Sequence, residues 1–573
     1  MQIREKLEKI ILEALRTQGV EVGSVLLEHP DELVHGDYAT NVALHYSKQL
    51  MVKPIDLAKK IVELIEENKP KEVEKIEIAG PGFINFYLSR EFFVESIQEI
   101  NKKGILFGAG KILDGEKVML EYTDPNPFKQ LHIGHLMSNT IGEALSRMTS
   151  WQGAEVKRAN YQGDIGLHVA KAIRGLLKLE KEFPREKESL NTKIAFIGKA
   201  YTDGANAYED DSKAKAEIDE LNKTLYAKDD ENINKLYEWG RKISLEHFEE
   251  IYKKLGTKFD YYFFESEVAQ MGVFLVEEFF KKGIFEKSEG AIVFPGEKYD
   301  LHTRVFVTSQ GLPTYETKEL GLNKKKYELY PFDRSIIITA NEITDYFKVL
   351  LKAMEFVYPE IANKTRHISH GMMRFQTGKM SSRKGNVITG ESLIADVEKM
   401  VEEKVKDRDY DAELKKEIVE KVAIGAIKYS ILRQSPGKDI IFDFEKSLSF
   451  EGDSGPYLQY TYARANSVLE KAKGPGDDSK VDLPNEISVT TIEKLLYRFP
   501  EIIERACKEY APQLIATYLI DIASAFNNFY AENQIIDKEN PAVTSHRLRI
   551  TQAISHVLKN GLEVLGIRAP EKM

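Results

Sequence analysis

Two short motifs, widely separated in the chain, constrain its fold more than any other feature. The first is His132-Ile133-Gly134-His135, and the second is Lys379-Met380-Ser381-Ser382. The apolar run at 118–122, just before the first motif, is typical of a buried strand. Apolar residues at helical spacing follow over 136–148, so the sequence predicts the order strand, turn, helix. This order is typical of α/β folds that bind a nucleotide at the amino end of a helix.

The residue types in both motifs suit the binding of a triphosphate. His132 and His135 can each donate a hydrogen bond to a phosphate or ribose oxygen, and Gly134 lets a nucleotide lie close to the backbone. Lys379 lies in a polar stretch bounded by glycines, which predicts a surface loop whose lysine can neutralise a leaving pyrophosphate. The alternatives are two satisfied histidines on an ordinary turn and a solvated basic loop. The pairing of the two motifs disfavours both alternatives.

Together the motifs resemble the two signatures of class I aminoacyl-tRNA synthetases. The resemblance implies that ATP with Mg²⁺ is a substrate, bound by His132, Gly134, His135, Lys379, Met380, Ser381 and Ser382. The family pattern of the second motif is Lys-Met-Ser-Lys-Ser, and Ser382 stands here in place of the second lysine.

Lys129, three residues before His132, could supply the missing charge from the other side. That exchange resembles the arginyl-tRNA synthetases in particular. It makes His132, His135, Lys379 and Lys129 the expected catalytic residues.

Length and composition agree with a large enzyme. The 573 residues suggest roughly three or four domains at about 150 residues each. The chain has no run of about 18 apolar residues and no signal-peptide core at its start, so we expect a cytoplasmic protein. Its one cysteine, Cys507, excludes internal disulfides and a cysteine-rich zinc site, and we expect no protein-bound metal. The net charge of −10 argues against a general nucleic-acid coat but leaves room for a local basic surface. We expect a monomer.

The expected fold class is α/β: a class I synthetase Rossmann-like catalytic domain, an N-terminal α+β additional domain and a C-terminal all-α anticodon-binding domain. Its N-terminal part carries predicted helices near 3–15 and after Pro54, and strands near 76–78 and 84–88. A lysine- and glutamate-rich stretch near 180–235 predicts solvated insertion helices. The expected domains are 1–110 (N-terminal, binding the tRNA elbow), 113–390 (catalytic, with insertions at about 180–300), 391–450 (helical bridge) and 451–573 (anticodon-binding).

An arginine pocket requires carboxylate or amide oxygens that meet a planar fork of N–H donors. The resemblance assigns this role to Glu121, Asn126, Tyr315 and Glu319. Glu319 stands where the family has aspartate, so its side chain is one methylene longer. Each of these acids could instead be an ordinary ion-paired residue. His168 replaces a family glutamine, and the segment 340–346 diverges enough that we assign it no catalytic role.

Several aromatic and polar residues are expected to contact tRNA. The helix opening at 454–464 is dense in tyrosine, and exposed tyrosines can stack on unpaired anticodon bases. In the N-terminal domain, Phe83 and Asn85 share one face of a strand and resemble the family's reader of a dihydrouridine-loop base. Core packing is the alternative for each aromatic residue. The expected tRNA contacts are Phe83, Asn85, Tyr457, Tyr460, Arg464, Tyr530 and Met573.

The resemblance implies an arginine–tRNA ligase that forms arginyl-adenylate from ATP and L-arginine and transfers it to the 3′-terminal adenosine of tRNA(Arg). It also implies that activation needs bound tRNA. One alternative is a cysteinyl-type class I synthetase, which the single cysteine disfavours. The other is a non-catalytic tRNA-binding paralogue, which the presence of His132, His135 and Lys379 disfavours.

Overall fold

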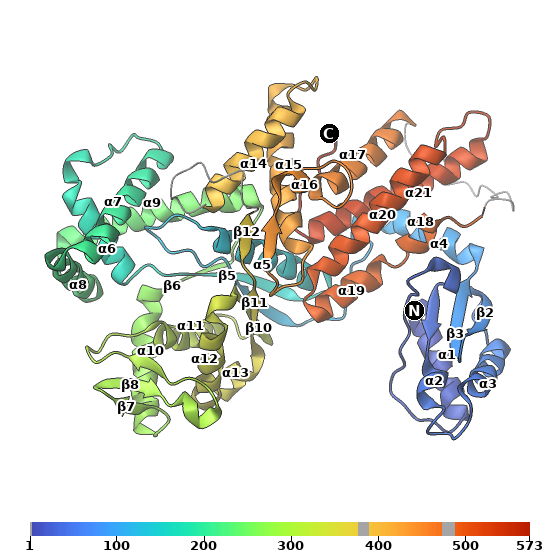
Figure 1. Ribbon diagram of the computed structural model, residues 1–573, viewed down its shortest axis with the longest axis horizontal. Coiled ribbons are helices and arrows are strands. Elements are labelled where there is room, and N and C mark those ends of the chain that lie inside the picture. Colours follow the sequence, from blue (N-terminus) through green and yellow to red (C-terminus); the bar gives the residue numbers. More distant parts are fainter. Residues whose placement is uncertain (1–2, 376–388, 473–487) are drawn as a thin grey trace.

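A computed structural model describes residues 3–375, 389–472 and 488–573 of the chain. The second motif, at 379–382, lies outside these described residues. The elements before residue 104 and the helices between 190 and 227 lie at opposite ends of the long axis (Figure 1). A parallel sheet and the C-terminal helices lie between them (Figure 1).

The N-terminal part is a small α+β unit. Its antiparallel sheet has the order β1-β3-β2, from β1 (Tyr38–Thr40), β3 (Phe83–Leu88) and β2 (Val73–Ala79). Four helices accompany the sheet: α1 (Ile3–Thr17), α2 (Val42–Tyr46), α3 (Pro54–Glu67) and α4 (Arg90–Lys103). Leu7, Ile61 and Phe86 belong to its buried core. The predicted helices and strands of this region are therefore confirmed.

The central sheet is parallel throughout and has the order β11-β10-β4-β5-β6. Its strands are β4 (Lys117–Glu121), β5 (Glu155–Gln162), β6 (Tyr261–Phe264), β10 (Arg334–Ala340) and β11 (Thr365–His370). The chain first extends the sheet from β4 to one side, and later returns to place β10 on the other side of β4. Ligands of open α/β sheets bind beyond the strand ends at such a switch point. The helix α5 (Ile133–Trp151) begins there, as the strand–turn–helix pattern predicted.

Helices and a small sheet surround the parallel sheet. The insertion consists of α6 (Leu167–Lys178), α7 (Leu190–Asp210), α8 (Ser212–Ala227) and α9 (Glu231–Leu255), which share an apolar core of their own. The next elements are α10 (Glu265–Lys281), β7 (Glu286–Ser288), β8 (Ala291–Phe294), β9 (Arg304–Val307), α11 (Tyr315–Leu329), α12 (Thr344–Val357) and α13 (Pro359–Lys364). The predicted insertion helices are thus present.

The rest of the chain is mainly helical. It contains β12 (Met373–Phe375), α14 (Gly390–Val405), α15 (Ala412–Leu432), β13 (Ile440–Phe442), α16 (Phe444–Ser447), α17 (Gly455–Lys471), α18 (Thr491–Leu496), α19 (Phe499–Glu509), α20 (Pro512–Glu532) and α21 (Pro541–Val564). One apolar core runs from α5 through α15 to α21, with Leu145, Ile427 and Leu558 among its buried members. The helix that carries the first motif is therefore packed directly into the C-terminal bundle.

The N-terminal unit is joined to the C-terminal helices by side chains. Tyr497, just after α18, is buried in the core of the N-terminal unit. Glu501 of α19 accepts hydrogen bonds from Tyr38 and from Arg4, the latter at 3.1 Å. Burial alone would raise the pKa of Glu501, but its hydrogen bonds and the nearby positive charges bring that pKa below its ordinary value. The two units share apolar and charged contacts, so their relative position has a structural basis.

Candidate active site

The first motif forms the start of α5, at the carboxyl ends of β4 and β10. The backbone N–H of His132 donates to Nδ1 of His135 at 3.2 Å, and the two rings stack with centroids 3.5 Å apart. A Cβ atom at Gly134 would lie 2.9 Å from the His132 ring, so a side chain at this position would force that ring to shift. The glycine predicted for close approach to a nucleotide therefore also makes room for the histidine beside it.

Both histidines are held in the neutral form. Burial lowers the pKa of His135 well below its ordinary value, and the neighbouring His132 and Lys129 lower it further. Burial also lowers the pKa of His132, with Lys129 as the next cause. Because Nδ1 of His135 accepts a hydrogen bond, the neutral ring carries its proton on Nε2. His135 is therefore prepared to donate a hydrogen bond from Nε2 to an oxygen of a ligand.

The connection from β4 to α5 is unusual in its backbone. Thr123, Asp124 and Phe128 all have positive φ, at 79°, 47° and 68°. Non-glycine residues adopt such angles rarely, and they cluster where structure is constrained by function. The backbone therefore leaves the strand conformation at these positions, between the end of β4 and the start of α5.

Lys129 lies near enough to both histidines to influence them. Its positive charge lowers the pKa of both His132 and His135, and its ammonium lies 5.4 Å from the ring of Tyr201 in α7. The flank of the second motif also reaches this place, because the N–H of Gly390 donates to the carbonyl of Leu131 at 2.8 Å. The residues of the second motif themselves, Lys379, Met380, Ser381 and Ser382, lie outside the described residues.

Three carboxylates gather at the end of β4. Glu121 is 1% exposed, Glu319 of α11 is 8% exposed, and Asp124 stands between β4 and α5. Burial raises the pKa of Glu319 and of Asp124 well above their ordinary values, and the negative charge of Glu121 raises both further. The ammonium of Lys326 lies 2.9 Å from Oε2 of Glu121, with both side chains buried. Three acids beside one buried cation form a site that favours a further positive charge.

The other two predicted arginine ligands lie around a second buried ion pair, between Glu265 and Lys318. The side-chain oxygen of Asn126 packs so close to Gly163 that a Cβ there would be 2.2 Å from it, and Glu265 borders the same spot. Tyr315 is 62% exposed, and its ring lies 5.0 Å from the Lys318 ammonium. Glu121 and Glu319 thus share one acidic cluster, while Asn126 and Tyr315 border another ion pair.

Tyr161 of β5 links the two groups. Burial raises the pKa of its hydroxyl well above the ordinary value, and Glu265 and then Glu319 raise it further. His168, which replaces a family glutamine, is bonded through Nε2 to the carbonyl of Gly163 at 2.7 Å, and burial lowers its pKa to about 3. The histidine therefore stays neutral and holds the turn that borders Asn126.

Sequence reasoning missed several members of this site. Asp124, Lys326, Glu265 and Lys318 had no assigned role, although Asp124 comes only three residues after the end of the buried strand β4. His370 ends β11, and its nearness lowers the pKa of both motif histidines, after burial and their closer neighbours. The strand-end position of Asp124 and His370 was an available signal, because carboxyl ends of parallel strands meet at one edge of a sheet.

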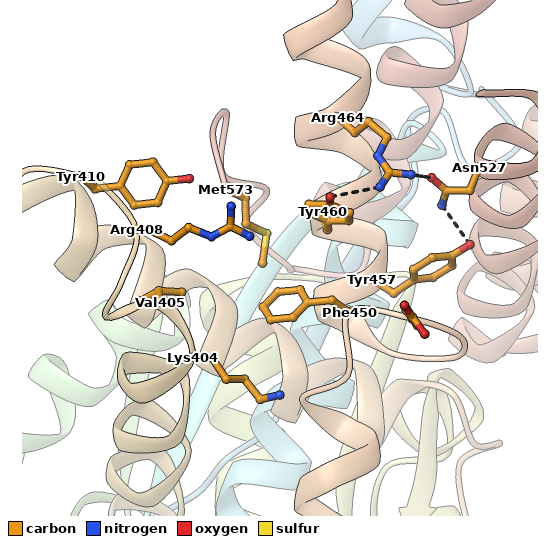
Figure 2. A pocket seen from close by; sticks show the side chains of 11 residues that line it. Lys404, Val405, Arg408, Tyr410, Phe450, Tyr457, Tyr460, Arg464, Asn527 and Met573 are labelled. Atoms are coloured by element: carbon orange, nitrogen blue, oxygen red, sulfur yellow. Dashed lines mark hydrogen bonds between the residues drawn. The ribbon is translucent and has the colours of Figure 1, made fainter. Parts of the chain in front are cut away.

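A second site is a cavity of about 350 Å³ among the helical elements, shown in Figure 2. It is lined by the end of α14, by the loops that follow α14 and precede α17, by α17 and α20, and by the last residue of the sequence. Its lining includes Lys404, Arg408, Tyr410, Phe450, Tyr457, Tyr460, Arg464, Asn527 and Met573. Four of the predicted tRNA contacts therefore line one cavity, and Tyr530 lies beside it with its ring centroid 5.2 Å from the Arg464 guanidinium.

Hydrogen bonds fix the side chains at this cavity. Arg464 donates to Asn527 and to the hydroxyl of Tyr460, the latter at 3.0 Å, and Asn527 donates to the hydroxyl of Tyr457 at 3.0 Å (Figure 2). Aromatic rings beside cations are the usual means of binding unstacked nucleobases. The cavity has this composition, with the cations of Lys404 and Arg408 on its opposite wall (Figure 2).

Phe83 and Asn85 share one face of β3, because Ile84 and Phe86 between and beyond them point into the core. Phe83 is 41% exposed, while Asn85 is 5% exposed and stands opposite Ala39 and Glu77 in the neighbouring strands. The aromatic residue of the pair is thus the accessible one.

Three family models match the chain. They are the tRNA synthetases class I (R) catalytic domain over 97–444, the DALR anticodon binding domain over 458–573 and the arginyl tRNA synthetase N terminal domain over 1–88. The arginine–tRNA ligase of Halothermothrix orenii is 32% identical, with all of both chains covered. That of Clostridium botulinum is 30% identical, with 96% of each covered. The solved arginyl-tRNA synthetase of Thermus thermophilus has the same fold, with a TM-score of 0.80 at 24% identity and full coverage of both chains.

The parallel sheet, the histidine motif at its switch point and these matches define a class I aminoacyl-tRNA synthetase. Within that class, the chain belongs to the arginyl-tRNA synthetase family. Its activity is that of an arginine–tRNA ligase, and the expected fold class is confirmed. The cysteinyl-type and non-catalytic alternatives are not favoured. Within the described ranges, no helix combines the length and apolar character needed to cross a membrane.

Proposed function

We propose that arginine is activated between the histidine motif and the acidic cluster at the end of β4. The carboxylate of arginine attacks the α-phosphate of ATP, which enters with Mg²⁺, and pyrophosphate leaves. Nε2 of His135 and the ring of His132 donate hydrogen bonds to oxygens on which negative charge develops. Lys129 and Lys379 neutralise the leaving pyrophosphate, while Gly134, Met380, Ser381 and Ser382 complete the ATP site. The 2′-hydroxyl of the terminal adenosine then attacks the activated carbonyl.

The acidic cluster is the observation that carries this proposal. Glu121 and Glu319 accept hydrogen bonds from the guanidinium, whose planar fork matches carboxylate oxygens. Asn126 and Tyr315 bind the remainder of arginine from the side of the Glu265–Lys318 pair. The excess of buried carboxylates over the single Lys326 ammonium supports a cationic side chain as ligand.

The tRNA is proposed to contact two separate surfaces. Its anticodon enters the cavity lined by Tyr457, Tyr460, Arg464 and Met573, with Tyr530 beside it. Its elbow meets Phe83 and Asn85 on β3. The exposure of Phe83 supports a stacking role, and the buried Asn85 would read a base edge only where the base inserts beside Phe83.

We further propose that the chain acts as a cytoplasmic monomer and divides as the sequence suggests. The N-terminal domain comprises 1–110, the catalytic domain 113–390, the helical bridge 391–450 and the anticodon-binding domain 451–573. The separate apolar core of the N-terminal sheet supports the first division. The continuous apolar core from α5 to α21 supports close packing of the catalytic domain, the helical bridge and the anticodon-binding domain against one another.

A crossed pair of variants tests the two substrate sites. Glu121→Gln should raise the KM for arginine roughly 10- to 100-fold, the effect of losing a charge-assisted hydrogen bond, with the KM for tRNA little changed. Arg464→Ala should raise the KM for tRNA about 5- to 100-fold, the effect of removing a contact to an unstacked base, with the KM for arginine little changed at saturating tRNA.

The control is Arg505→Ala, which removes an exposed arginine of α19 whose ion pair is with Glu509, one turn along the same helix. Both kinetic constants should stay at wild-type values in this control. Steady-state aminoacylation measures all three variants, and their melting temperatures show whether each is folded. Equal effects of Glu121→Gln on both substrates would contradict the assignment of Glu121.

A further inference from the structure

One face of α11 carries a row of buried polar side chains that the proposed reaction uses only in part. Glu319, Asn323 and Lys326 are spaced by four and three residues, so they share one face of the helix. Their exposed fractions are 8%, 0% and 0%. Buried polar groups lower stability unless they are bonded, so a row of three requires partners.

These side chains connect the two carboxylates assigned to the guanidinium. The ammonium of Lys326 lies 2.9 Å from Oε2 of Glu121 and 3.4 Å from Oδ1 of Asn323. The amide nitrogen of Asn323 donates to the backbone carbonyl of Glu319 at 2.9 Å and to its Oε2 at 3.4 Å. The order is therefore Glu121, Lys326, Asn323, Glu319, and it joins the end of β4 to α11.

We propose that Asn323 and Lys326 are positioning residues that determine the specificity of this enzyme for arginine. Asn323 sets the reach of Glu319 by holding its carboxylate back along α11. Lys326 sets the orientation and charge of Glu121. This inference rests on the proposed binding of arginine by Glu121 and Glu319.

The reach of Glu319 follows from its length. Glutamate has three rotatable side-chain bonds, and an unrestrained carboxylate one methylene longer than aspartate would occupy several positions in the pocket. Asn323 stands one helical turn further along and bonds both the carbonyl and the carboxylate of Glu319. A restrained carboxylate loses less conformational entropy when the guanidinium arrives.

The charge of the pocket follows from the count of buried ionisable groups. The carboxylates of Glu121, Glu319 and Asp124 influence one another, and the Lys326 ammonium opposes their repulsion. With Lys326 beside Glu121, burial and the charge of Glu121 raise the pKa values of Glu319 and Asp124, and a further cation in the pocket would favour their ionised forms. A guanidinium supplies the missing positive charge, whereas a neutral side chain of the same shape leaves the carboxylates unpaired.

A simpler role for Asn323 would be to satisfy Lys326 and one helix carbonyl without influence on arginine. The two roles differ in one respect. Positioning makes the effect of Asn323 depend on the length of residue 319, whereas a purely structural role makes it independent of that length. A double-mutant cycle between the two positions measures this dependence.

The experiment compares Asn323→Ala, Glu319→Asp and the double variant by ATP–pyrophosphate exchange at saturating tRNA. Asn323→Ala alone should raise the KM for arginine about 3- to 10-fold, as expected for one net hydrogen bond, with the KM for ATP unchanged. Adding it to Glu319→Asp should change the KM for arginine less than about twofold, because the shorter carboxylate needs no restraint. Equal effects in both backgrounds, or no effect in either, would overturn the role of Asn323.

Lys326 is tested by Lys326→Met and Lys326→Arg. The methionine variant should raise the KM for arginine at least about tenfold, since Glu121 loses a charged partner, and the arginine variant should recover most of this loss. Lys324→Met is the matched control on the same helix, because Lys324 is partly exposed and its ion pair with Glu328 is 4.0 Å long. If Lys326→Met does not fold, the KM for arginine of Lys326→Arg is compared with that of wild type. A KM close to wild type then shows that a positive charge at residue 326 is sufficient. An unchanged KM in a folded Lys326→Met protein would overturn the proposal.

Glu319→Gln separates failure of this inference from failure of the proposed arginine site. A raised KM for arginine in Glu319→Gln, together with an unaltered KM in Asn323→Ala, would leave the site intact and remove only the positioning role. An unaltered KM in both variants would remove Glu319 from the arginine site itself, and the positioning role with it.

Discussion

The ammonium of Lys428 donates a hydrogen bond of 2.8 Å to the carbonyl oxygen of Gly566. The same ammonium donates to the carbonyl of Leu255 at 2.6 Å, so one buried lysine of α15 closes the ends of both α9 and α21. A Cβ atom at Gly566 would lie within 3.6 Å of Lys428, Glu143 and Arg147, the last two in the motif helix α5. The end of the anticodon-binding bundle and the helix of the catalytic motif therefore meet at this lysine.

Burial lowers the pKa of Lys428 to about 7, and this makes stability depend on pH. Between pH 7 and the unfolded value near 10.5, the unfolded chain binds a proton that the folded chain lacks. The contribution of this group to stability therefore rises with pH across that window, by at most about 1.4 kcal/mol per pH unit. We expect the stability of wild type relative to Lys428→Met to increase between pH 7 and 9, measured as urea midpoints. A pH-independent difference would contradict the lowered pKa.

The two motif histidines should act on the rate rather than on the affinity for arginine. His132→Ala and His135→Ala are each expected to lower the rate of activation about 10²- to 10³-fold, the effect of losing one donor to developing negative charge. The KM for arginine should change far less, because neither ring lies in the acidic cluster. Aminoacylation at saturating ATP is the measurement. A kcat close to wild type in both variants would exclude their catalytic role.

Glu319→Gln should weaken arginine binding and stabilise the ligand-free protein. The pKa of Glu319 is raised on folding, so the folded chain holds a proton that the unfolded chain releases above pH 4.5. The stability associated with this group is present below that pH and is lost as the pH rises through the folded pKa. At pH 7.5 the neutral glutamine avoids this loss, and the melting temperature without arginine should equal or exceed that of wild type.

The same variant should raise the KM for arginine roughly 10- to 100-fold. Steady-state aminoacylation gives the KM, and differential scanning calorimetry without arginine gives the melting temperature. A lower melting temperature together with an unchanged KM would show that Glu319 is a structural residue.

The double variant Phe83→Ala/Asn85→Ala tests elbow binding. Loss of a stacking contact should lower kcat/KM for tRNA about 5- to 100-fold. The melting temperature should change little if the exposed Phe83, rather than Asn85, makes the main contact with tRNA. Pyrophosphate exchange should fall at limiting tRNA and recover when tRNA is raised. Because Asn85 is 5% exposed, the single variants are the control. Unfolding caused by Asn85→Ala alone, with normal charging by Phe83→Ala, would make both of them core residues.

Much of the architecture was predictable because local patterns dictate it. The apolar run before the histidine motif became β4, the periodic residues after it became α5, and Pro54 begins α3. Strand and helix periodicities are local properties of a sequence, so they can be recognised without knowing which elements pack against each other in the fold. The resemblance of the motifs to a known family allowed the fold class and the activity to be predicted as well, and the family matches confirm both.

The contents of the arginine pocket were only partly predictable. Glu121 and Glu319 were expected there, but their connection through Lys326 and Asn323 was not. Asp124 and the Glu265–Lys318 pair also escaped notice. Charged residues are common on exposed helices, so a lysine in α11 carries no local sign that it is buried. Its burial depends on the strand that lies beside it.

The sequence by itself determined the strand and helix around the first motif, the two signature motifs and the family, because each motif and each element depends on residues close together in the chain. The tertiary structure decided which polar groups face one another: Lys326 with Glu121, Lys428 with the carbonyl of Gly566, and Glu501 with Arg4 and Tyr38. These partners are far apart in sequence, and only chain packing brings them within bonding distance. Burial then removes water from between them, which turns ordinary surface residue types into groups with altered pKa values and fixed positions.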